Sequence, residues 1–305
     1  MRKFAVFFTL LLSFSLFAGC AGNPGGQAST SKLSVVTSFY PMYDFACKVG
    51  GDRVSVTNLT PAGVEPHDWE PSASDMIKLE KADVFIYNGA GMEHWVDSVL
   101  SSLENKKLTV VEASVSAPFL SADAGTNTAS SSVDPHVWLD PEIAKIEMNT
   151  ILDAFKTADA ENADYFQANF DRYAAEFDKL DKEFSSSLAG LPQKNIVVAH
   201  NAFGYLCSAY GLVQVPIEGL SADSEPDAAR MSTIIDFVKK NNVKVIFFEE
   251  LVSPKVAETI AKETGSSTAV LNPLEGISAK DQAAGEDYFS VMRANLQALI
   301  GALSK

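Results

Sequence analysis

Three of the four histidines in this chain occur in similar local settings, each close to a proline or an aromatic residue. His67 lies in a Glu-Pro-His-Asp-Trp segment, His136 in an Asp-Pro-His-Val-Trp segment, and His200 begins a His-Asn-Ala-Phe-Gly-Tyr segment. Each lies in or next to a connection between a predicted strand and a predicted helix. Because ligands collect outside the carboxyl ends of the strands in open parallel sheets, we expect these side chains to converge.

The three imidazoles indicate a metal site, and their borderline softness suits zinc. A fourth ligand would complete a tetrahedron. The segment after the last predicted strand offers Glu275 as a carboxylate and Asn272 as a neutral, weak ligand. Glu249 and Glu250, which end an apolar predicted strand, are rival carboxylates. His94, at a predicted helix start, is expected to be solvated or to lie behind the ligands rather than to bind metal directly.

The elements that must position these residues form two alternating sets of β-rich runs and helical patterns. The predicted strands are 33–38, 54–59, 84–88, 108–112, 195–199, 212–217, 243–249 and 268–271. The predicted helices are 42–49, 72–81, 93–103, 202–210, 227–241, 254–264 and 281–303, and a further helix follows His136. Strands that alternate with helices predict parallel sheets covered on both faces.

One long amphipathic helix is predicted between the two sets, over residues 160–190. From Phe166 to Leu188 its apolar residues recur at steps of three and four, and no Pro or Gly interrupts them. We therefore predict an α/β fold in which two parallel-sheet lobes, residues 32–158 and 191–305, are joined by one long rigid helix. The metal site is expected in the cleft between the lobes.

The start of the chain has the pattern of a secretory signal peptide over residues 1–19. Basic residues precede a largely apolar run, Phe4–Phe17, which is shorter than the roughly 20 residues that span a membrane. Small residues directly before Cys20 predict cleavage there and lipidation of Cys20, and residues 20–31 form a flexible tether. The alternative is an ordinary cleaved signal with an incidental cysteine.

Composition limits the classes of function. The chain has 305 residues, a formal net charge of −15 and 47% hydrophobic residues, enough for a sizeable core and about two domains. Its acidity argues against nucleic acid as a partner, because phosphate binding requires clustered Lys and Arg. Cys47 and Cys207 lie in apolar helical patterns and are expected to be buried free thiols rather than a disulfide.

Together these motifs resemble a known family, the metal-binding lipoproteins of zinc and manganese ABC importers, over nearly all of residues 32–305. The resemblance rests on the Gly-x-Glu-Pro-His, Asp-Pro-His-x-Trp-Leu-Asp-Pro and His-x-Ala-Phe-Gly-Tyr segments. It implies two α/β domains joined by one long helix and a metal at their interface. It also implies that the ligands include His67, His136 and His200.

The resemblance also bears on the fourth ligand and on the metal. Many members place an Asp in an Asp-Pro-Leu-Gly motif, where this chain has Asn272. Zinc-type members carry Asn-Pro-Leu-Glu, as here, and use the Glu, which implies Glu275. Manganese-type members tend to replace the third His with Glu, whereas this chain keeps His200.

We therefore expect an extracytoplasmic zinc-binding protein, lipid-anchored to the cell membrane through Cys20, that passes Zn(II) to an ABC permease and its ATPase. A monomer without enzymatic activity and without a nucleic-acid partner is expected. The alternatives are a manganese-binding component of the same type of importer and a surface adhesin with a metal site. A zinc hydrolase is disfavoured because four protein ligands leave no open coordination position.

Overall fold

The computed structural model describes residues 32–121, 133–220 and 226–305. The predicted signal peptide (1–19), the tether (20–31) and the lipidation site Cys20 lie outside the described residues. Residues 32–305 form one compact unit. Within the described ranges, no helix combines the length and the apolar character needed to cross a membrane.

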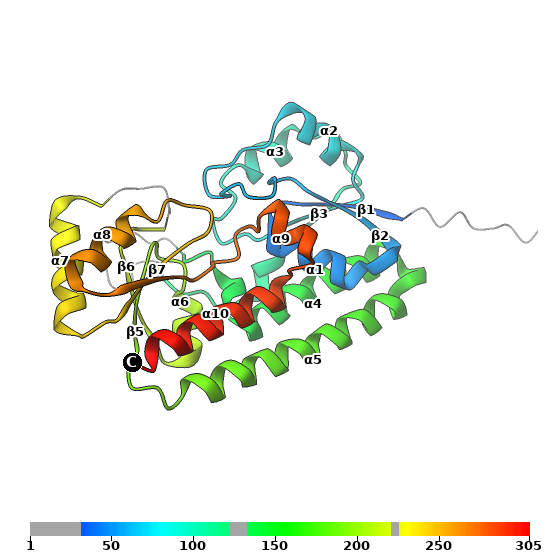
Figure 1. Cartoon of the computed structure of the whole chain (residues 1–305). Helices are drawn as coiled ribbons and strands as arrows, with labels where there is room; N and C mark the ends of the chain where they lie inside the picture. Colours follow the sequence, from blue (N-terminus) through cyan, green and yellow to red (C-terminus); the bar gives the residue numbers. More distant parts are fainter. Residues whose placement is uncertain (1–31, 122–132, 221–225) are drawn as a thin grey trace, which may run out of the picture. The chain divides into compact units, whose positions relative to one another are not determined.

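Two four-stranded sheets, each entirely parallel, form the framework (Figure 1). The first has the order β2-β1-β3-β4 and the second the order β6-β5-β7-β8. Their strands are β1 (Leu33–Thr37), β2 (Val54–Asn58), β3 (Val84–Tyr87), β4 (Thr109–Glu112), β5 (Asn195–Val198), β6 (Val213–Pro216), β7 (Val245–Phe248) and β8 (Ser267–Val270). The predicted fold class is confirmed, and the predicted strands differ from the observed ones only at their ends.

Alternate residues along the strands belong to different core clusters, so both faces of each sheet are buried. Val35 packs in one core cluster and its neighbour Val36 in another. In the second sheet, Ile196 and Val198 face the first of these clusters, whereas Val197 faces a third cluster. Successive strand residues point to opposite faces, so strands buried on both sides read as continuous apolar runs. The cluster that holds Val35 and Ile196 therefore runs through both sheets as one shared core.

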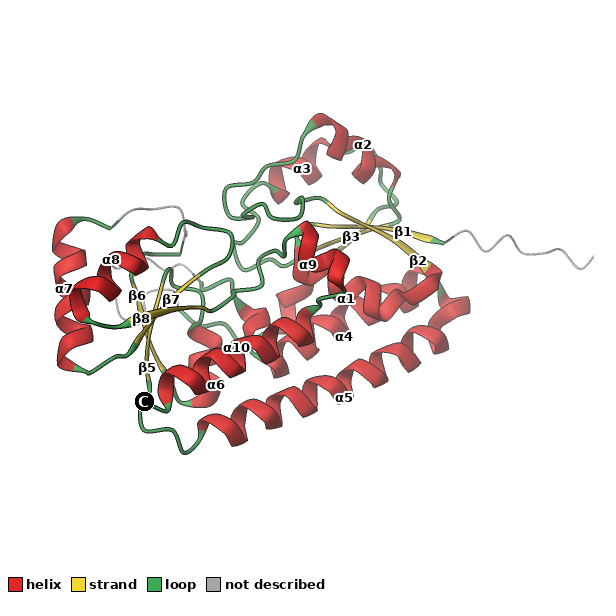
Figure 2. Cartoon of the chain, in the orientation of Figure 1, coloured by secondary structure: helices red, strands yellow, loops and turns green. Residues whose placement is uncertain are grey.

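The helices form layers on the two faces of the sheets (Figures 1 and 2). They are α1 (Tyr40–Gly50), α2 (Ala73–Lys81), α3 (Val96–Ser102), α4 (Pro141–Ala158), α5 (Ala163–Leu188), α6 (Gly204–Tyr210), α7 (Ala228–Lys240), α8 (Lys255–Thr264), α9 (Ala279–Ala284) and α10 (Tyr288–Leu303). In both figures α2 and α3 lie on one side of the first sheet, and α1 and α4 lie on the other.

The long predicted helix is α5, which begins slightly later than expected, at Ala163, and ends at Leu188. It buries Phe166, Phe177 and Leu180 on one face. This face packs against α1, α4 and α10, so α5 is bound along its length by helices from early and late parts of the chain. The lobe boundaries drawn from the sequence remain a prediction.

The end of the chain differs from the prediction. In place of one helix over 281–303, α9 ends at Ala284 and is followed by Gly285, whose φ is +85°, and α10 begins after Asp287. The Asp287 side chain accepts a hydrogen bond from the backbone N–H of Ser290 at 2.9 Å, which caps α10. Apolar residues occur on both sides of this break, so the sequence pattern alone read as one continuous helix.

Asp287 also ties α10 to the start of the fold. Lys48, on α1, is buried and lies 2.9 Å from Asp287 and 2.7 Å from Asp44. The ammonium of Lys48 thus links α1 to the residue that caps α10, and the Phe45 and Tyr288 rings of the two helices lie 5.2 Å apart. The final helix therefore packs against the first helix as well as against α5.

The two cysteines within the described residues are free, as predicted, but only Cys207 is buried and Cys47 is partly exposed. Cys47 and Cys207 are both free thiols. Burial raises the pKa of Cys47 to about 11 and also raises the pKa of Cys207. Both are therefore inert thiols near neutral pH.

The shared core predicts the cost of opening a cavity on α5. Phe177 is fully buried, with ring centroids 5.8 Å from Phe45, 5.3 Å from Tyr288 and 4.8 Å from Phe289. We expect Phe177→Ala to lower the free energy of unfolding by about 3–5 kcal/mol, measured by denaturant titration. The exposed Lys179→Ala on the same helix should change it by less than about 0.5 kcal/mol. Equal effects of the two substitutions would contradict this packing.

Candidate metal-binding site

Four side chains from distant parts of the chain converge on one point. The carboxylate Oε1 of Glu275 lies 3.0 Å from His136 Nε2, 3.1 Å from His200 Nε2 and 3.2 Å from His67 Nε2. One donor atom from each of these residues lies within 4.8 Å of all the others. The structure therefore brings together all four residues that the sequence singled out for the site.

The separations between donor atoms fit a tetrahedral ion. Zinc binds histidine nitrogen at about 2.0–2.1 Å, so donors at tetrahedral corners lie about 3.3 Å apart. Besides the three distances to Glu275, His67 Nε2 lies 3.2 Å from His136 Nε2, which in turn lies 3.4 Å from His200 Nε2. These five separations are close to the edges of a zinc tetrahedron, and all four donor atoms lie within 4.8 Å of one another.

The topology of the sheets explains the convergence. His67 follows β2, His200 directly follows β5 and Glu275 follows β8, while His136 lies in the long connection from β4 to α4. All four therefore lie beyond the carboxyl ends of parallel strands. The two sheets present these edges to each other, which places the site between the two sheets.

The Asp-Pro-His motif positions His136. The Asp134 carboxylate lies 2.7 Å from His136 Nδ1 and also accepts a hydrogen bond from the backbone N–H of His136 at 3.0 Å. A carboxylate on Nδ1 directs Nε2 towards the metal and raises its basicity. Further along the motif, Asp140 caps α4 by accepting from the Glu142 N–H at 2.9 Å. The motif thus serves orientation as well as binding.

Glu249 performs the same task for His200. Its carboxylate lies 2.6 Å from His200 Nδ1, on the side of the ring opposite Glu275. This carboxylate, a rival ligand in the sequence, therefore holds a ligand in place and is not part of the donor cluster. Sequence reasoning missed this role of Glu249, and also that of Asp134. The signal was present, because metal-ligating imidazoles usually donate their second N–H to a carboxylate.

A close approach between the two motifs depends on Gly204. A Cβ at this position would lie 2.6 Å from Asp134 Oδ2. The neighbouring Tyr205 hydroxyl donates to the carbonyl of Asp134 at 2.9 Å and accepts from the Leu120 N–H, also at 2.9 Å. The Phe-Gly-Tyr part of the His200 segment therefore joins that segment to the His136 motif.

His67 is the ligand candidate with the most solvent contact. Its side chain is 12% exposed, whereas His136 and His200 are fully buried. The Glu65 carboxylate accepts from the His67 backbone N–H at 3.0 Å and shapes this turn. His67 also lines a surface cavity of about 510 Å³ together with Asp68, Ala90, Gly91, Val133, Pro135 and Leu220.

The loop that bears Glu275 has a specific backbone shape. Asn272 Oδ1 accepts from the Leu274 N–H at 2.7 Å, and Leu274 adopts a left-handed conformation with φ of +59°. The Asn272 amide also donates to the Glu250 carboxylate at 3.0 Å. Asn272 and Glu250 thus shape the loop and lie outside the donor cluster. A left-handed residue without glycine is costly and persists only where its surroundings enforce it.

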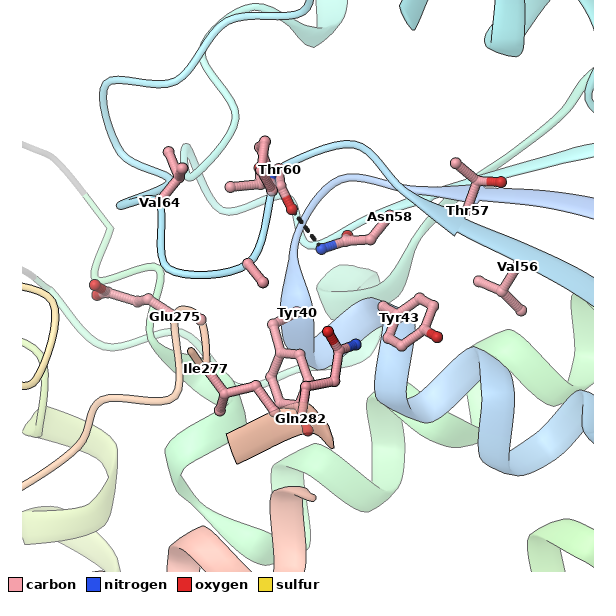
Figure 3. A pocket seen from close by; sticks show the side chains of 13 residues that line it. Tyr40, Tyr43, Val56, Thr57, Asn58, Thr60, Val64, Glu275, Ile277 and Gln282 are labelled. Atoms are coloured by element: carbon pink, nitrogen blue, oxygen red, sulfur yellow. Dashed lines mark hydrogen bonds between the residues drawn. The ribbon is translucent and has the colours of Figure 1, made fainter. Parts of the chain in front are cut away.

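A second cavity, of about 310 Å³, lies behind this loop (Figure 3). It is lined by Tyr40, Tyr43, Gln282 and neighbouring residues. In Figure 3 the carboxylate of Glu275 points away from the two tyrosine rings. The cavity therefore adjoins the loop rather than the donor atoms.

His94 lies apart from the cluster, in agreement with the expectation that it is not a direct ligand. Its side chain is 52% exposed, and Nε2 lies 3.4 Å from the Glu70 carboxylate.

The environment of the cluster favours the protonated forms of His136 and His200 when no metal is bound. Burial acts to lower the pKa of His136, but hydrogen bonds and charge from Asp134 and Glu275 outweigh it and raise the pKa. Burial opposes protonation of His200 too, yet the charges of Glu275 and Glu249 raise its pKa well above the usual value. Burial acts to raise the pKa of Glu275, but the His200 charge and the hydrogen bonds hold it well below the usual range. An incoming cation must therefore displace protons from the imidazoles.

Known proteins are similar to this chain in sequence. Residues 35–302 match the family model described as zinc-uptake complex component A, periplasmic. The chain is 40% identical over 310 residues to the high-affinity zinc uptake system protein ZnuA of Bacillus subtilis, which covers 98% of this chain and 97% of that protein. Streptococcal relatives are longer. The chain spans 60% of the zinc-binding lipoprotein AdcA of Streptococcus pneumoniae, at 39% identity over 307 residues.

Solved structures of related proteins are also similar to the structure of this chain. The Zn(II)-bound ZnuA-like domain of Streptococcus pneumoniae AdcA has a TM-score of 0.80 and 40% identity, covering 90% of this chain and 100% of that one. The laminin binding protein Lmb of Streptococcus agalactiae, described as having adhesin and metal transporting activity, has a TM-score of 0.81 and 34% identity. That match also covers 90% of this chain and 100% of the other.

The carboxylate behind His200 gives a direct test of the geometry. Glu249→Gln removes the charge that orients the ring while keeping its size, so zinc affinity should fall about ten- to a hundredfold. The measurement is competition against a chelator of known affinity. Glu263→Gln makes the same change at an exposed position of α8 and should leave affinity within about twofold of the unsubstituted protein. Equal losses for the two variants would refute the orienting role.

Proposed function

Since the chain belongs to the zinc-uptake complex component A family, we propose that it captures Zn(II) outside the cytoplasm and delivers the ion to a membrane permease. The proposed ligands are His67, His136, His200 and Glu275. The observation that carries the proposal is the convergence of these donors, five of whose six separations are 3.0–3.4 Å, close to the edge lengths of a zinc tetrahedron.

The donor set favours zinc over manganese. Three imidazoles and one carboxylate form a borderline-soft set, whereas manganese prefers more oxygen ligands in an octahedron. The carboxylates of Asp134 and Glu249, which lie behind two of the ligands, are engaged by the Nδ1 atoms of the two buried imidazoles. They are therefore not available to supply additional oxygen ligands.

Capture rather than catalysis suits this site. The family is one of solute-binding proteins. A catalytic zinc keeps one position open for water or substrate, whereas four protein donors close the coordination sphere. The ion is therefore cargo, held and then released intact.

Delivery requires a partner and a location. The family is described as periplasmic and as a component of an uptake complex. The finer proposal is that residues 1–19 are removed on secretion, that a lipid on Cys20 anchors the chain to the cell membrane, and that residues 20–31 tether the folded unit. The partners in this proposal are an ABC permease and its ATPase, and the protein acts as a monomer of two lobes, 32–158 and 191–305, joined by the helix between them. Adhesion to laminin, stated for the Streptococcus agalactiae relative, is not part of the proposal.

Competition between metals tests the proposed cargo. Residues 32–305, stripped of metal and offered equal zinc and manganese, should retain one zinc per chain and keep it in excess manganese. Glu275→Ala should weaken zinc binding by at least about tenfold, because a direct ligand matters no less than its outer partners. Glu263→Ala, at an exposed position of α8, is the control. Retention of manganese instead would assign the protein to manganese uptake, and absence of any bound metal would remove the ligand assignment.

The pKa values predict how zinc affinity depends on pH. The pKa values of His136 and His200 are raised in the metal-free protein, so protons already compete with zinc above the ordinary histidine pKa of about 6.5. Glu275, with its lowered pKa, stays ionised throughout. Displacement of at least one proton implies that affinity falls at least about a hundredfold from about pH 7.5 to about pH 5.5. A chelator competition that gave a flat profile would be incompatible with imidazole ligands.

A further inference from the structure

The indole of Trp138 connects two of the loops that carry the proposed ligands. Trp138 lies two residues after His136, in the short turn Val137–Leu139. Its Nε1–H donates to the carbonyl of Pro273 at 2.8 Å, two residues before Glu275. Both partners are buried. One hydrogen bond therefore spans 135 positions of sequence and joins the segment of an imidazole ligand to that of the carboxylate ligand.

Trp138 itself is fixed on three sides. The Phe39 ring packs edge-on against it at a centroid distance of 5.0 Å, and the His136 ring lies 5.3 Å away. The Tyr288 hydroxyl donates to its carbonyl at 2.7 Å. The side chain is fully buried. The direction of the indole N–H is therefore set by packing, as a positioning group requires.

The Glu275 loop depends on such external anchors. At its start, the Asn272 N–H donates to Asn295 Oδ1 at 2.8 Å, which ties it to α10. At its end, the carbonyl of Ile277 accepts from the Gly63 N–H at 3.1 Å, in the loop of His67. Between these points Leu274 is held in a left-handed conformation. The hydrogen bond from Trp138 to the Pro273 carbonyl attaches this strained stretch to the His136 segment, two residues before Glu275.

We propose that Trp138 is a positioning residue that sets the location of the Glu275 carboxylate relative to His136. The inference rests on the proposed function, because it concerns the fourth ligand of the zinc site. Without the indole N–H, the buried Pro273 carbonyl loses its partner and the loop shifts to regain one. Glu275 Oε1 then leaves the 3.0–3.2 Å separations that it keeps from the three imidazoles. Loss of a group that orients a metal ligand typically lowers metal affinity about ten- to a hundredfold.

A double-mutant cycle on residues 32–305 tests the inference, with zinc itself as the probe. Trp138→Phe keeps an aromatic ring and removes the N–H. It should weaken zinc binding about tenfold in the unsubstituted chain and by less than about twofold in a Glu275→Ala background. A merely structural role would weaken binding equally in both backgrounds. Equal losses, or no loss in the unsubstituted chain, would overturn the inference.

Controls separate this result from failure to fold and from failure of the proposed function. Tyr210→Phe likewise removes the polar hydrogen of an aromatic side chain, one that donates to Asp181 on α5 at 3.1 Å, and should leave zinc affinity unchanged. Thermal unfolding of each metal-free variant reports folding. If Trp138→Phe does not fold, Tyr288→Phe, which removes the hydroxyl that holds the Trp138 carbonyl, takes its place with the same expected dependence on Glu275. Tight zinc binding with additive losses would overturn the inference alone, whereas an unsubstituted chain that binds no zinc would overturn the proposed function and this inference with it.

Discussion

The contact of one carboxylate oxygen with three imidazoles is the constraint on which the rest of the structure depends. Glu275 Oε1 lies within 3.2 Å of all three Nε2 atoms, although the four residues follow four different strands or strand connections. Such a cluster tolerates little error, since donors must be held within about 0.5 Å to bind an ion well. The buried carboxylates behind His136 and His200, the cap at Asp140 and the anchors of the Glu275 loop all serve this accuracy.

Most of the framework could be predicted from the sequence, and the reason is local. Runs such as 84–87 and 245–248 are apolar because both faces of each sheet are buried, so each run marks a strand without knowledge of its neighbours. The three histidines could be found for a related reason, since each lies in or next to a strand-to-helix connection that the pattern had already located. Glu275 needed one more step, the resemblance to zinc-type proteins, because the residues alone left Glu249 and Glu250 as rivals.

What could not be predicted depends on contacts between distant segments. Glu249 was recognised as a carboxylate near the site, but only the fold shows that it faces Nδ1 of His200 rather than the metal position. The pairing of Trp138 with Pro273 leaves no trace in spacing or periodicity, because one partner is a backbone carbonyl. The break before α10 is similar. Asp287 and Gly285 indicate a helix boundary only once the apolar pattern is known to belong to two helices.

The location of the donors has a consequence for evolution. None of the four lies within a strand or a regular α-helix, and the shared core that supports the sheets does not include them. A ligand residue can therefore be substituted during evolution without a change in the core. The bound ion can then change while the fold stays the same. The strands and helices determine the fold, whereas a few loop positions determine which ion the protein binds.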